Sequence, residues 1–351
     1  MALGYHTVVA TETRRVRSDV LARAVQFTAP RRIDLVSVDL PERTSSTELI
    51  VRSAYSGVSA GTEMLAYRGE LGADTSLDES LSGLPGTFEY PFLYGYSCVG
   101  WVEQGTATVP AGSLVFAFYP HQDRFVVADR DAVLLDAHTD PRLATLFPLV
   151  ETALQLTLDA GPVLNETVVV TGLGTVGLLT ALLLRRAGAY VLAAEPQQWR
   201  REIADALGIT AVPPEQLPMV VAEATAGRGT SVLVELSGAP AALEEGLALL
   251  THEGTALVGS WYGTKRVSLP LGSEFHRRRL TIRSSQVSSI PAALGSRWDV
   301  GRRRATARLL LADLPLQVLA TSEFPFADAA AAYAAVDRGE PGLLHAALRY
   351  E

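Results

Sequence analysis

A short apolar run followed by three spaced glycines constrains the fold of this chain more than any other feature. Residues 168–170 are three consecutive valines, which predict a strand buried on both faces of a parallel sheet. Gly172, Gly174 and Gly177 follow at once. In this spacing the first glycine permits a tight turn, the second lets a pyrophosphate approach backbone N–H groups, and the third lets the next helix lie close to the strand. The stretch therefore predicts a strand, a turn and a helix whose N-terminus faces an anion.

The residues after the glycines predict which dinucleotide binds. Thr175 and Val176, at the start of a helix that we expect to run to residue 187, join the glycines as cofactor-binding candidates. A second buried strand then ends at Glu195. An acid about 20 residues beyond the glycines accepts hydrogen bonds from the ribose hydroxyls of NAD and repels a 2′-phosphate. This favours NAD, while Arg200 just downstream leaves NADP open.

Length and charge bound the class of protein. A chain of 351 residues is longer than a domain with a single hydrophobic core usually is, so its length predicts two domains. With a net charge of −8, the protein is not expected to attract nucleic acid or an anionic membrane. Because the N-terminus has no signal-peptide pattern and no apolar run is long enough to span a bilayer, we expect a cytoplasmic protein. The single cysteine, Cys98, excludes an internal disulfide.

The order of predicted elements indicates an α/β protein with one domain inserted in another. Residues 22–69 and 90–136 read as strands of a barrel-like β domain, and residues 70–87 as either a lid or a solvent loop. Strands and helices alternate after residue 141, with PMVVAEA at 218–224 read as strand-like. The predicted units are an N-terminal extension (1–21), a catalytic β domain (22–155), a Rossmann doubly wound parallel sheet (156–289) and a return to the catalytic domain (290–351).

Several motifs carry a resemblance to a known family. They are SGVSAGTE at 56–63, PFLYGYSCVG at 91–100, TGLGTVG at 171–177, VELSG at 234–238 and FPFADAAAAYAAVDRG at 324–339. Together they resemble the medium-chain dehydrogenase/reductase superfamily over nearly the whole chain. The resemblance implies a GroES-like β-barrel, an inserted Rossmann domain and a homodimer. The GTE and GY pair is most similar to the bacteriochlorophyllide dehydrogenase branch, which oxidises a secondary alcohol with NAD.

The chain departs from the zinc enzymes of that superfamily at the ligand positions. The place of the first ligand, a cysteine, falls on Ser59 or Ala60, the histidine place is Tyr96, and only Glu151 remains as a ligand type. A hydroxyl, a phenol and one carboxylate do not make a tetrahedral zinc site. We therefore expect no zinc and no other metal.

Without a metal, side chains must stabilise the developing charge and move the proton. The resemblance gives Thr62 the hydroxyl of a proton relay and places Tyr96 in the cleft, where its phenol is a candidate donor. His121 is a loop histidine suited to acid–base work, and Glu151 is a candidate for orienting a donor. The alternatives are a turn-forming threonine, a tyrosine packed in the barrel wall, a structural histidine and a helix-capping glutamate.

The resemblance also implies contacts to the nicotinamide and the substrate. The nicotinamide candidates follow the later strands of the Rossmann domain and are Ser237, Gly259, Ser260, Trp261 and Ser285. The substrate candidates are Glu63, Tyr119, Tyr262 and His276. Trp261 and Tyr262 suit stacking on a flat substrate or a subunit contact. The run from His276 through three arginines suits an anionic group or a solvated face.

These observations predict a zinc-independent, NAD-preferring oxidoreductase. It would move hydride between nicotinamide and a carbonyl or secondary alcohol of a small organic substrate. Two alternatives stay open: reduction of an activated C=C bond, as in zinc-free quinone and enoyl reductases, and a nucleotide-binding sensor that has lost its chemistry.

Overall fold

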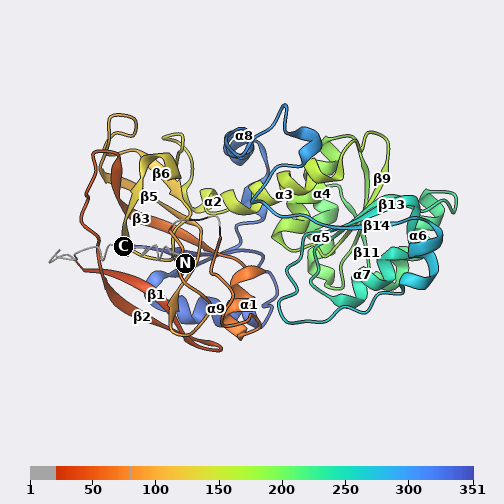
Figure 1. The fold of residues 1–351 in the computed structure, drawn as a ribbon, viewed down its shortest axis with the longest axis horizontal. Helices are drawn as coiled ribbons and strands as arrows, with labels where there is room; N and C mark the ends of the chain where they lie inside the picture. The colour runs from red at the N-terminus through yellow and green to blue at the C-terminus, as the bar shows by residue number, and fades with distance from the viewer. Residues whose placement is uncertain (1–20, 80, 82) are drawn as a thin grey trace, which may run out of the picture.

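The computed structural model describes residues 21–79, 81 and 83–351, so the predicted extension at 1–21 lies almost wholly outside the described residues. The described chain forms two lobes (Figure 1). The first lobe contains both the early strands and the last strands of the chain, and the second contains the middle of the chain. No helix among the described residues is long and apolar enough to cross a membrane.

The first lobe is built from two β-sheets. A three-stranded sheet has the order β2-β1-β4, and a larger sheet has the order β15-β16-β3-β5-β6-β8, with β7 also paired to β3. The strands are β1 (Leu21–Ala29), β2 (Arg32–Asp39), β3 (Glu48–Val58), β4 (Phe92–Leu93), β5 (Cys98–Gln104), β6 (Leu114–Ala117), β7 (Arg124–Ala128), β8 (Ala132–Leu134), β15 (Ser322–Pro325) and β16 (Ala346–Arg349). Because β16 pairs antiparallel with β3, the end of the chain completes the lobe that its beginning started.

Among the described residues three α-helices belong to the first lobe, and one of them corrects a prediction. The segment predicted to be β-rich up to residue 69 ends in a helix, α1 (Thr62–Arg68), which Gly69 closes in the left-handed conformation at φ 73°. Methionine, leucine and alanine, which are good helix formers, outweigh the strand pattern before them. The other helices are α2 (Pro141–Ala144) and α9 (Ala329–Asp337). The buried face of α9 packs on the aromatic side chains of β1 and β4.

The second lobe contains a six-stranded parallel sheet. Its order is β11-β10-β9-β12-β13-β14. The strands are β9 (Thr167–Thr171), β10 (Tyr190–Ala194), β11 (Thr210–Val212), β12 (Thr230–Glu235), β13 (Leu250–Val258) and β14 (Thr281–Ser284). The predicted valine strand is confirmed: Val168 and Val170 pack into the core on one face, and Val169 packs into the core on the other.

Helices cover both faces of the parallel sheet. On the face of Val168 lie α3 (Phe147–Ala160), α4 (Thr175–Arg186) and α5 (Gln198–Ala206), with α8 (Val300–Asp313) packed on α3. On the other face lie α6 (Leu217–Ala224) and α7 (Pro240–Leu247). The strand-like interpretation of residues 218–224 was wrong. Pro218 lies in the first turn of α6, where a helix tolerates proline, and Leu217 and Val221, one helical turn apart, are the buried residues of the helix.

The described residues between 70 and 88 include side chains that pack against the first lobe. Leu77, Leu84 and Phe88 are at most 5% exposed and join the core beside β1 and β4. The N–H of Thr264, from the second lobe, donates to the carbonyl of Glu70 at 3.0 Å. This segment is therefore part of the contact between the lobes.

Candidate active site

The glycine turn between β9 and α4 has two glycines that the protein's own packing requires. Gly172 has φ 86°, and a Cβ there would lie 2.6 Å from the Cα of Ser237. A Cβ on Gly177 would lie 2.0 Å from the carbonyl oxygen of Gly172. At Gly174, by contrast, none of the described atoms lies within 4 Å of such a Cβ. The middle glycine leaves open space at the N-terminus of α4, which fits a pyrophosphate.

Glu195 directly follows β10 and lies beside this turn. The residue is only 2% exposed. Its carboxylate accepts hydrogen bonds from the N–H groups of Leu173, at 2.8 Å, and Gln197, at 3.0 Å. Nη1 of Arg200 lies 3.8 Å from Oε2 of Glu195. The Nε of Arg200 is buried and has no hydrogen-bond partner among the described residues. An acid and a cation thus stand together at the place predicted to bind the adenosine ribose.

Glu235, which ends β12, organises the next part of the same sheet edge and was missed from sequence. It is fully buried and accepts hydrogen bonds from the N–H of Ser237 at 2.7 Å and from the hydroxyl of Tyr262 at 2.8 Å. The hydroxyl of Ser260 lies 2.9 Å from the N–H of Gly238 and accepts its hydrogen bond. Burial, followed by the charge of Glu235, raises the pKa of Tyr262. The signal available in the sequence was an acid ending a buried strand, as at Glu195.

The remaining cofactor candidates lie along this edge. The N–H of Gly259 donates to the carbonyl of Glu235 at 3.0 Å, and that of Ser285 donates to the carbonyl of Val258 at 2.9 Å. Thr175, in the first turn of α4 with Val176, donates its hydroxyl hydrogen bond to the carbonyl of Leu344, from the first lobe. The carboxyl ends of the parallel strands therefore meet the first lobe.

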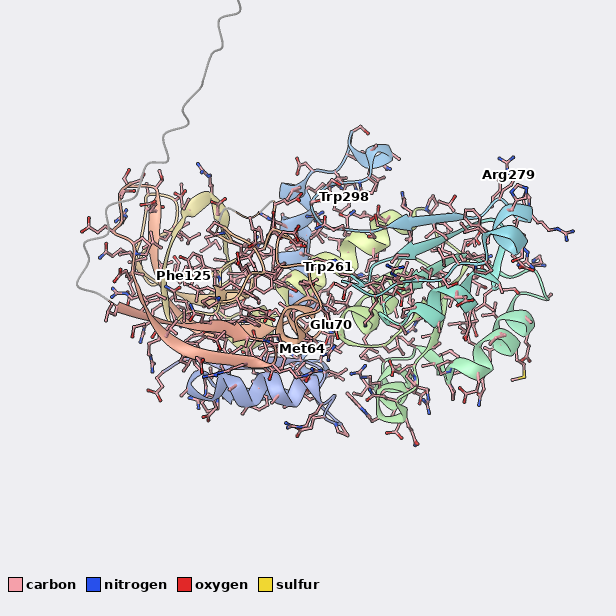
Figure 2. All side chains as sticks on the ribbon, turned by 60° about the horizontal axis from the view of Figure 1, so that its bottom comes forward. Met64, Glu70, Phe125, Trp261, Arg279 and Trp298 are labelled. Atoms are coloured by element: carbon pink, nitrogen blue, oxygen red, sulfur yellow. The ribbon has the colours of Figure 1, made fainter. Side chains whose placement is uncertain are left out.

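Aromatic side chains run from the lobe junction toward Tyr96. Figure 2 shows Trp261 near Glu70 at the boundary between the lobes. Trp261 is 44% exposed, and its ring centroid lies 6.1 Å from that of Phe88. Phe88 lies 5.1 Å from Tyr94, and Tyr94 lies 6.2 Å from Tyr96, all as edge contacts.

Tyr96 presents a protonated phenol. Burial is the largest cause that raises its pKa, the negative charge of Glu63 adds to it, and hydrogen bonds with the side chains of Ser59 and Thr62 act in the opposite direction. The net effect keeps the phenol neutral at physiological pH, so it is available as a hydrogen-bond and proton donor. The structure brings together two of the predicted catalytic residues, Thr62 and Tyr96.

Glu63 and His121 lie behind them, and neither is exposed. Nε2 of His121 lies 2.9 Å from Oε2 of Glu63, and both side chains are 0% exposed. Nδ1 of His121 lies 2.7 Å from the hydroxyl of Ser56. With both ring nitrogens engaged inside the lobe, His121 has no surface for a substrate. Tyr333 of α9 donates its hydroxyl hydrogen bond to Glu63 as well, a partner that sequence reasoning missed.

Glu151, on α3, is held by arginines of α8. Oε1 of Glu151 lies 3.0 Å from Nε and 2.9 Å from Nη2 of Arg303, a side chain that is 1% exposed. Nε of Arg304 lies 3.5 Å from the same oxygen. This carboxylate is neutralised within the protein, and Arg303 is another residue that the sequence did not single out.

Two predicted substrate residues lie elsewhere. Tyr119 stacks on Phe125 in the barrel, with ring centroids 4.4 Å apart. His276 is exposed, and its carbonyl accepts from the N–H of Arg279. Figure 2 places Arg279 at the end of the second lobe remote from Trp261. The basic run binds its own lobe there, since Arg278 donates to the carbonyls of Ala248 and Leu250.

A β-barrel lobe joined to a parallel nucleotide-binding sheet, with the glycine turn facing their junction, is the architecture of medium-chain alcohol dehydrogenases. An alcohol dehydrogenase from Thermus sp. ATN1 superposes with a TM-score of 0.74 over 94% of this chain and 100% of that one, at 20% identity. The predicted fold class is therefore confirmed.

Sequence matches extend over the middle of the chain. Residues 175–298 match the family model described as zinc-binding dehydrogenase. L-threonine 3-dehydrogenase of Pyrococcus abyssi is 36% identical over 147 residues, which cover 40% of this chain and 41% of that protein. 5-exo-Hydroxycamphor dehydrogenase of Pseudomonas putida is 31% identical over 221 residues, covering 58% and 57%. These two relatives are named as dehydrogenases, and the match spans about two fifths of the length of the first and three fifths of the second.

Proposed function

We propose that this protein is an NAD-preferring, zinc-independent dehydrogenase that acts on a carbonyl or secondary alcohol of a small organic substrate. The carrying observation is the pairing of a glycine turn, open at Gly174, with Tyr96, whose phenol lies beside Ser59 and Thr62 and whose pKa is raised by burial. Threonine and hydroxycamphor, named in the relatives, both carry a hydroxyl group. This supports alcohol chemistry over reduction of a C=C bond. The specific branch, bacteriochlorophyllide dehydrogenase, is a prediction from the GTE and GY motifs alone.

The residues fit a dinucleotide. The N-terminus of α4 and Gly174 would hold the pyrophosphate, and Glu195 would accept hydrogen bonds from the ribose. Ser237, Gly259, Ser260 and Ser285 would line the nicotinamide end. When bound, the nicotinamide supplies or accepts the hydride. A 2′-phosphate would meet the charge of Glu195, which favours NAD, although Arg200 gives NADP a possible partner.

The residues do not fit zinc. Zinc takes thiolate, imidazole and carboxylate ligands in a tetrahedral arrangement. Here Ser59 and Ala60 provide no thiolate, Tyr96 holds its proton, and Glu151 is bound by Arg303. Within the described part of the chain, no group of three His, Cys, Asp or Glu side chains is placed to hold a metal ion. The match to a zinc-binding family covers residues 175–298, which do not include these positions.

The protein's own residues would then carry the proton chemistry. In the reducing direction, Tyr96 donates a hydrogen bond to the substrate oxygen and then its proton as the alkoxide forms. Ser59 and Thr62 orient the phenol through their hydroxyls, and they stabilise the phenolate that is left. Trp261 and Phe88 provide an apolar wall at the junction. Substrate binding between the lobes excludes water from this region.

A substrate panel tests the proposal. Purified protein is assayed at 340 nm with NADH and ketones, with NAD and secondary alcohols, and with an α,β-unsaturated ketone whose product is identified by mass spectrometry. The expected result is carbonyl reduction and alcohol oxidation, with no loss of rate after dialysis against a chelator. Reduction of the carbon–carbon bond alone would favour the enoyl-reductase alternative. Tight dinucleotide binding without turnover would favour a sensor, and stoichiometric zinc in fresh protein would overturn zinc independence.

The proposal includes a homodimer formed through the second lobe. Strand β14 is an edge of the parallel sheet, and its residues are mostly exposed. An edge strand with free backbone groups is a template for pairing with a second copy. Light scattering on the purified protein measures the oligomeric state directly, and a monomer at micromolar concentration would contradict this part.

A further inference from the structure

We propose that Tyr333 and Glu63 are positioning residues of this enzyme: with His121 they form a buried hydrogen-bond chain that holds the turn at residues 59–63, and through it Tyr96, in its working orientation. This inference rests on the proposed function, in which Tyr96 is the proton donor. It assigns a catalytic contribution to α9, a helix that touches neither the nucleotide turn nor the lobe junction in the contacts described above.

Glu63 is the centre of the chain. It is fully buried, and its carboxylate receives hydrogen bonds from three donors: the N–H of Ser59 at 3.0 Å, Nε2 of His121 at 2.9 Å and the hydroxyl of Tyr333 at 2.5 Å. These donors come from the end of β3, the loop before β7 and helix α9. Both oxygens of this buried carboxylate therefore have hydrogen-bond partners.

The other hydrogen bonds give the chain a consistent direction. With Nε2 of His121 donating to Glu63, Nδ1 accepts from the hydroxyl of Ser56. The oxygen of Ser56 lies 2.9 Å from the hydroxyl of Tyr350 and accepts from it. The chain therefore runs from Tyr350 through Ser56 and His121 to Glu63, where Tyr333 joins it. Every polar side-chain group along this path has a partner.

Two routes lead from this chain to Tyr96. The first is the turn itself: the carboxylate of Glu63 accepts from the N–H of Ser59, and the side chains of Ser59 and Thr62 lie close enough to the phenol of Tyr96 to lower its pKa. The second is Gly95, the residue before Tyr96, where a Cβ would lie 2.5 Å from Cδ2 of His121. The imidazole thus packs directly against the backbone that carries the phenol.

A stability role alone explains this arrangement poorly. Taking charged groups out of water is costly, and a buried ionic network often contributes no more stability than apolar side chains of the same volume. A fully satisfied network does fix one geometry of its members. The ring of Tyr333 is also held independently of its hydroxyl, because it packs against Phe27 at 5.4 Å and Tyr67 at 5.5 Å.

The test removes one hydroxyl and leaves the ring. Tyr333→Phe is compared with Tyr67→Phe, a matched control in which a neighbouring buried tyrosine outside the chain loses its hydroxyl. For Tyr333→Phe we expect kcat to fall about tenfold, as for the loss of one buried hydrogen bond to a charged group. KM and the Kd for NADH should stay within about twofold, because the substrate and nucleotide contacts are intact. Tyr67→Phe should match the wild type in all three.

A second measurement does not depend on turnover. Hydrogen exchange of the Ser59 amide, followed by mass spectrometry of a peptide spanning residues 56–66, reports whether Glu63 still holds the turn. Exchange should accelerate in Tyr333→Phe and more in Glu63→Gln, and stay unchanged in Tyr67→Phe. An unchanged kcat in Tyr333→Phe overturns the positioning role. If the wild type turns over no substrate, the proposed function fails, and unchanged exchange in both variants would overturn the chain itself.

Discussion

Nη2 of Arg303 lies 2.9 Å from Oε1 of Glu151, and both side chains are at most 2% exposed. Arg303 also donates to the side chain of Gln155 at 2.6 Å and to the carbonyl of Val287. One guanidinium therefore joins α8, α3 and the segment after β14. Since α3 leads into the parallel sheet, this residue fixes the path by which the chain passes between the lobes.

Removing Arg303 should destabilise the fold strongly. Arg303→Met leaves the carboxylate of Glu151 buried without its main partner, which costs about 3–5 kcal/mol in comparable sites. The double variant Arg303→Met with Glu151→Gln should regain part of the loss, because the buried negative charge is removed together with its partner; the guanidinium of Arg304, which also lies near Glu151, is partly exposed to water. Urea denaturation measures both, with Arg308→Met, a more exposed arginine of the same helix, as control. Equal losses for Arg303→Met and Arg308→Met would contradict the assignment.

Two alanine substitutions in the glycine turn should have opposite effects. Gly174→Ala meets open space, so the free energy of unfolding should change by less than about 1 kcal/mol, while the Kd for NADH rises at least about tenfold because the methyl group blocks the pyrophosphate. Gly177→Ala should destabilise the protein by roughly 1–3 kcal/mol, since its Cβ collides with the carbonyl of Gly172. Thermal unfolding measures the effect of each variant on stability, and fluorescence titration measures its effect on the Kd for NADH. Unaltered NADH affinity in Gly174→Ala would argue against pyrophosphate binding at the turn.

Removing the charge of Glu195 should shift the cofactor preference toward NADP. Glu195→Gln keeps an acceptor for the N–H of Leu173 but no longer repels a 2′-phosphate, and Arg200 stands nearby as a phosphate partner. We expect the ratio of the Kd for NADPH to the Kd for NADH to fall about tenfold. Adding Arg200→Gln should cancel most of that gain. A ratio that does not move in Glu195→Gln would show that this acid does not select the cofactor.

His345 should make stability depend on pH between about 6.5 and 4. It is buried at the start of β16, with Nε2 2.9 Å from the hydroxyl of Thr145. Burial, and then the charge of Arg142, lower its pKa to about 4, below the value of about 6.5 expected in the unfolded chain. The unfolded state therefore binds the proton more readily, and the stability present above pH 6.5 is lost as the pH falls toward 4, by roughly 3 kcal/mol in total.

Replacing this histidine separates its titration from that of the carboxylates. The change in unfolding free energy between pH 7 and pH 4.5 should be smaller in His345→Gln than in the wild type, whereas His252→Gln, at an exposed position, should behave as the wild type. Urea denaturation at the two pH values provides the measurement. If the unfolding free energy falls by the same amount between the two pH values in the wild type and in His345→Gln, His345 does not cause the pH dependence.

Local features of the sequence predicted the nucleotide-binding half well, because the residues that indicate it lie close together in the sequence. The glycines, the valine strand and Glu195 fall within 30 residues, and each has a backbone reason for its identity. Segment 218–224 misled because a run with two valines suits a strand as well as a buried helix, and tertiary packing decided between them. The alanine-rich sequence of α9 does not indicate which partner its tyrosine, Tyr333, contacts.

The site in the first lobe depends on partners remote in the chain. Tyr333 and Glu63 are 270 residues apart, and Arg303 and Glu151 are 152 apart. No spacing rule connects such pairs, so Glu151 and His121 were predicted as reactive groups on their residue types alone. Their full burial, and the partners that hold them, follow only from the packing of the C-terminal return on the earlier strands.

The pairing of β16 with β3 has a consequence for biosynthesis. Ala346 pairs with Val58 across that ladder, so the ribosome must synthesise the chain through β16 before β3 gains this partner. The nucleotide-binding sheet lies wholly between these two strands and is free to fold earlier. The early strands of the first lobe are thus translated before that sheet but completed after it, and until β16 is made the edge of β3 that it covers is open to chaperones or to another nascent copy.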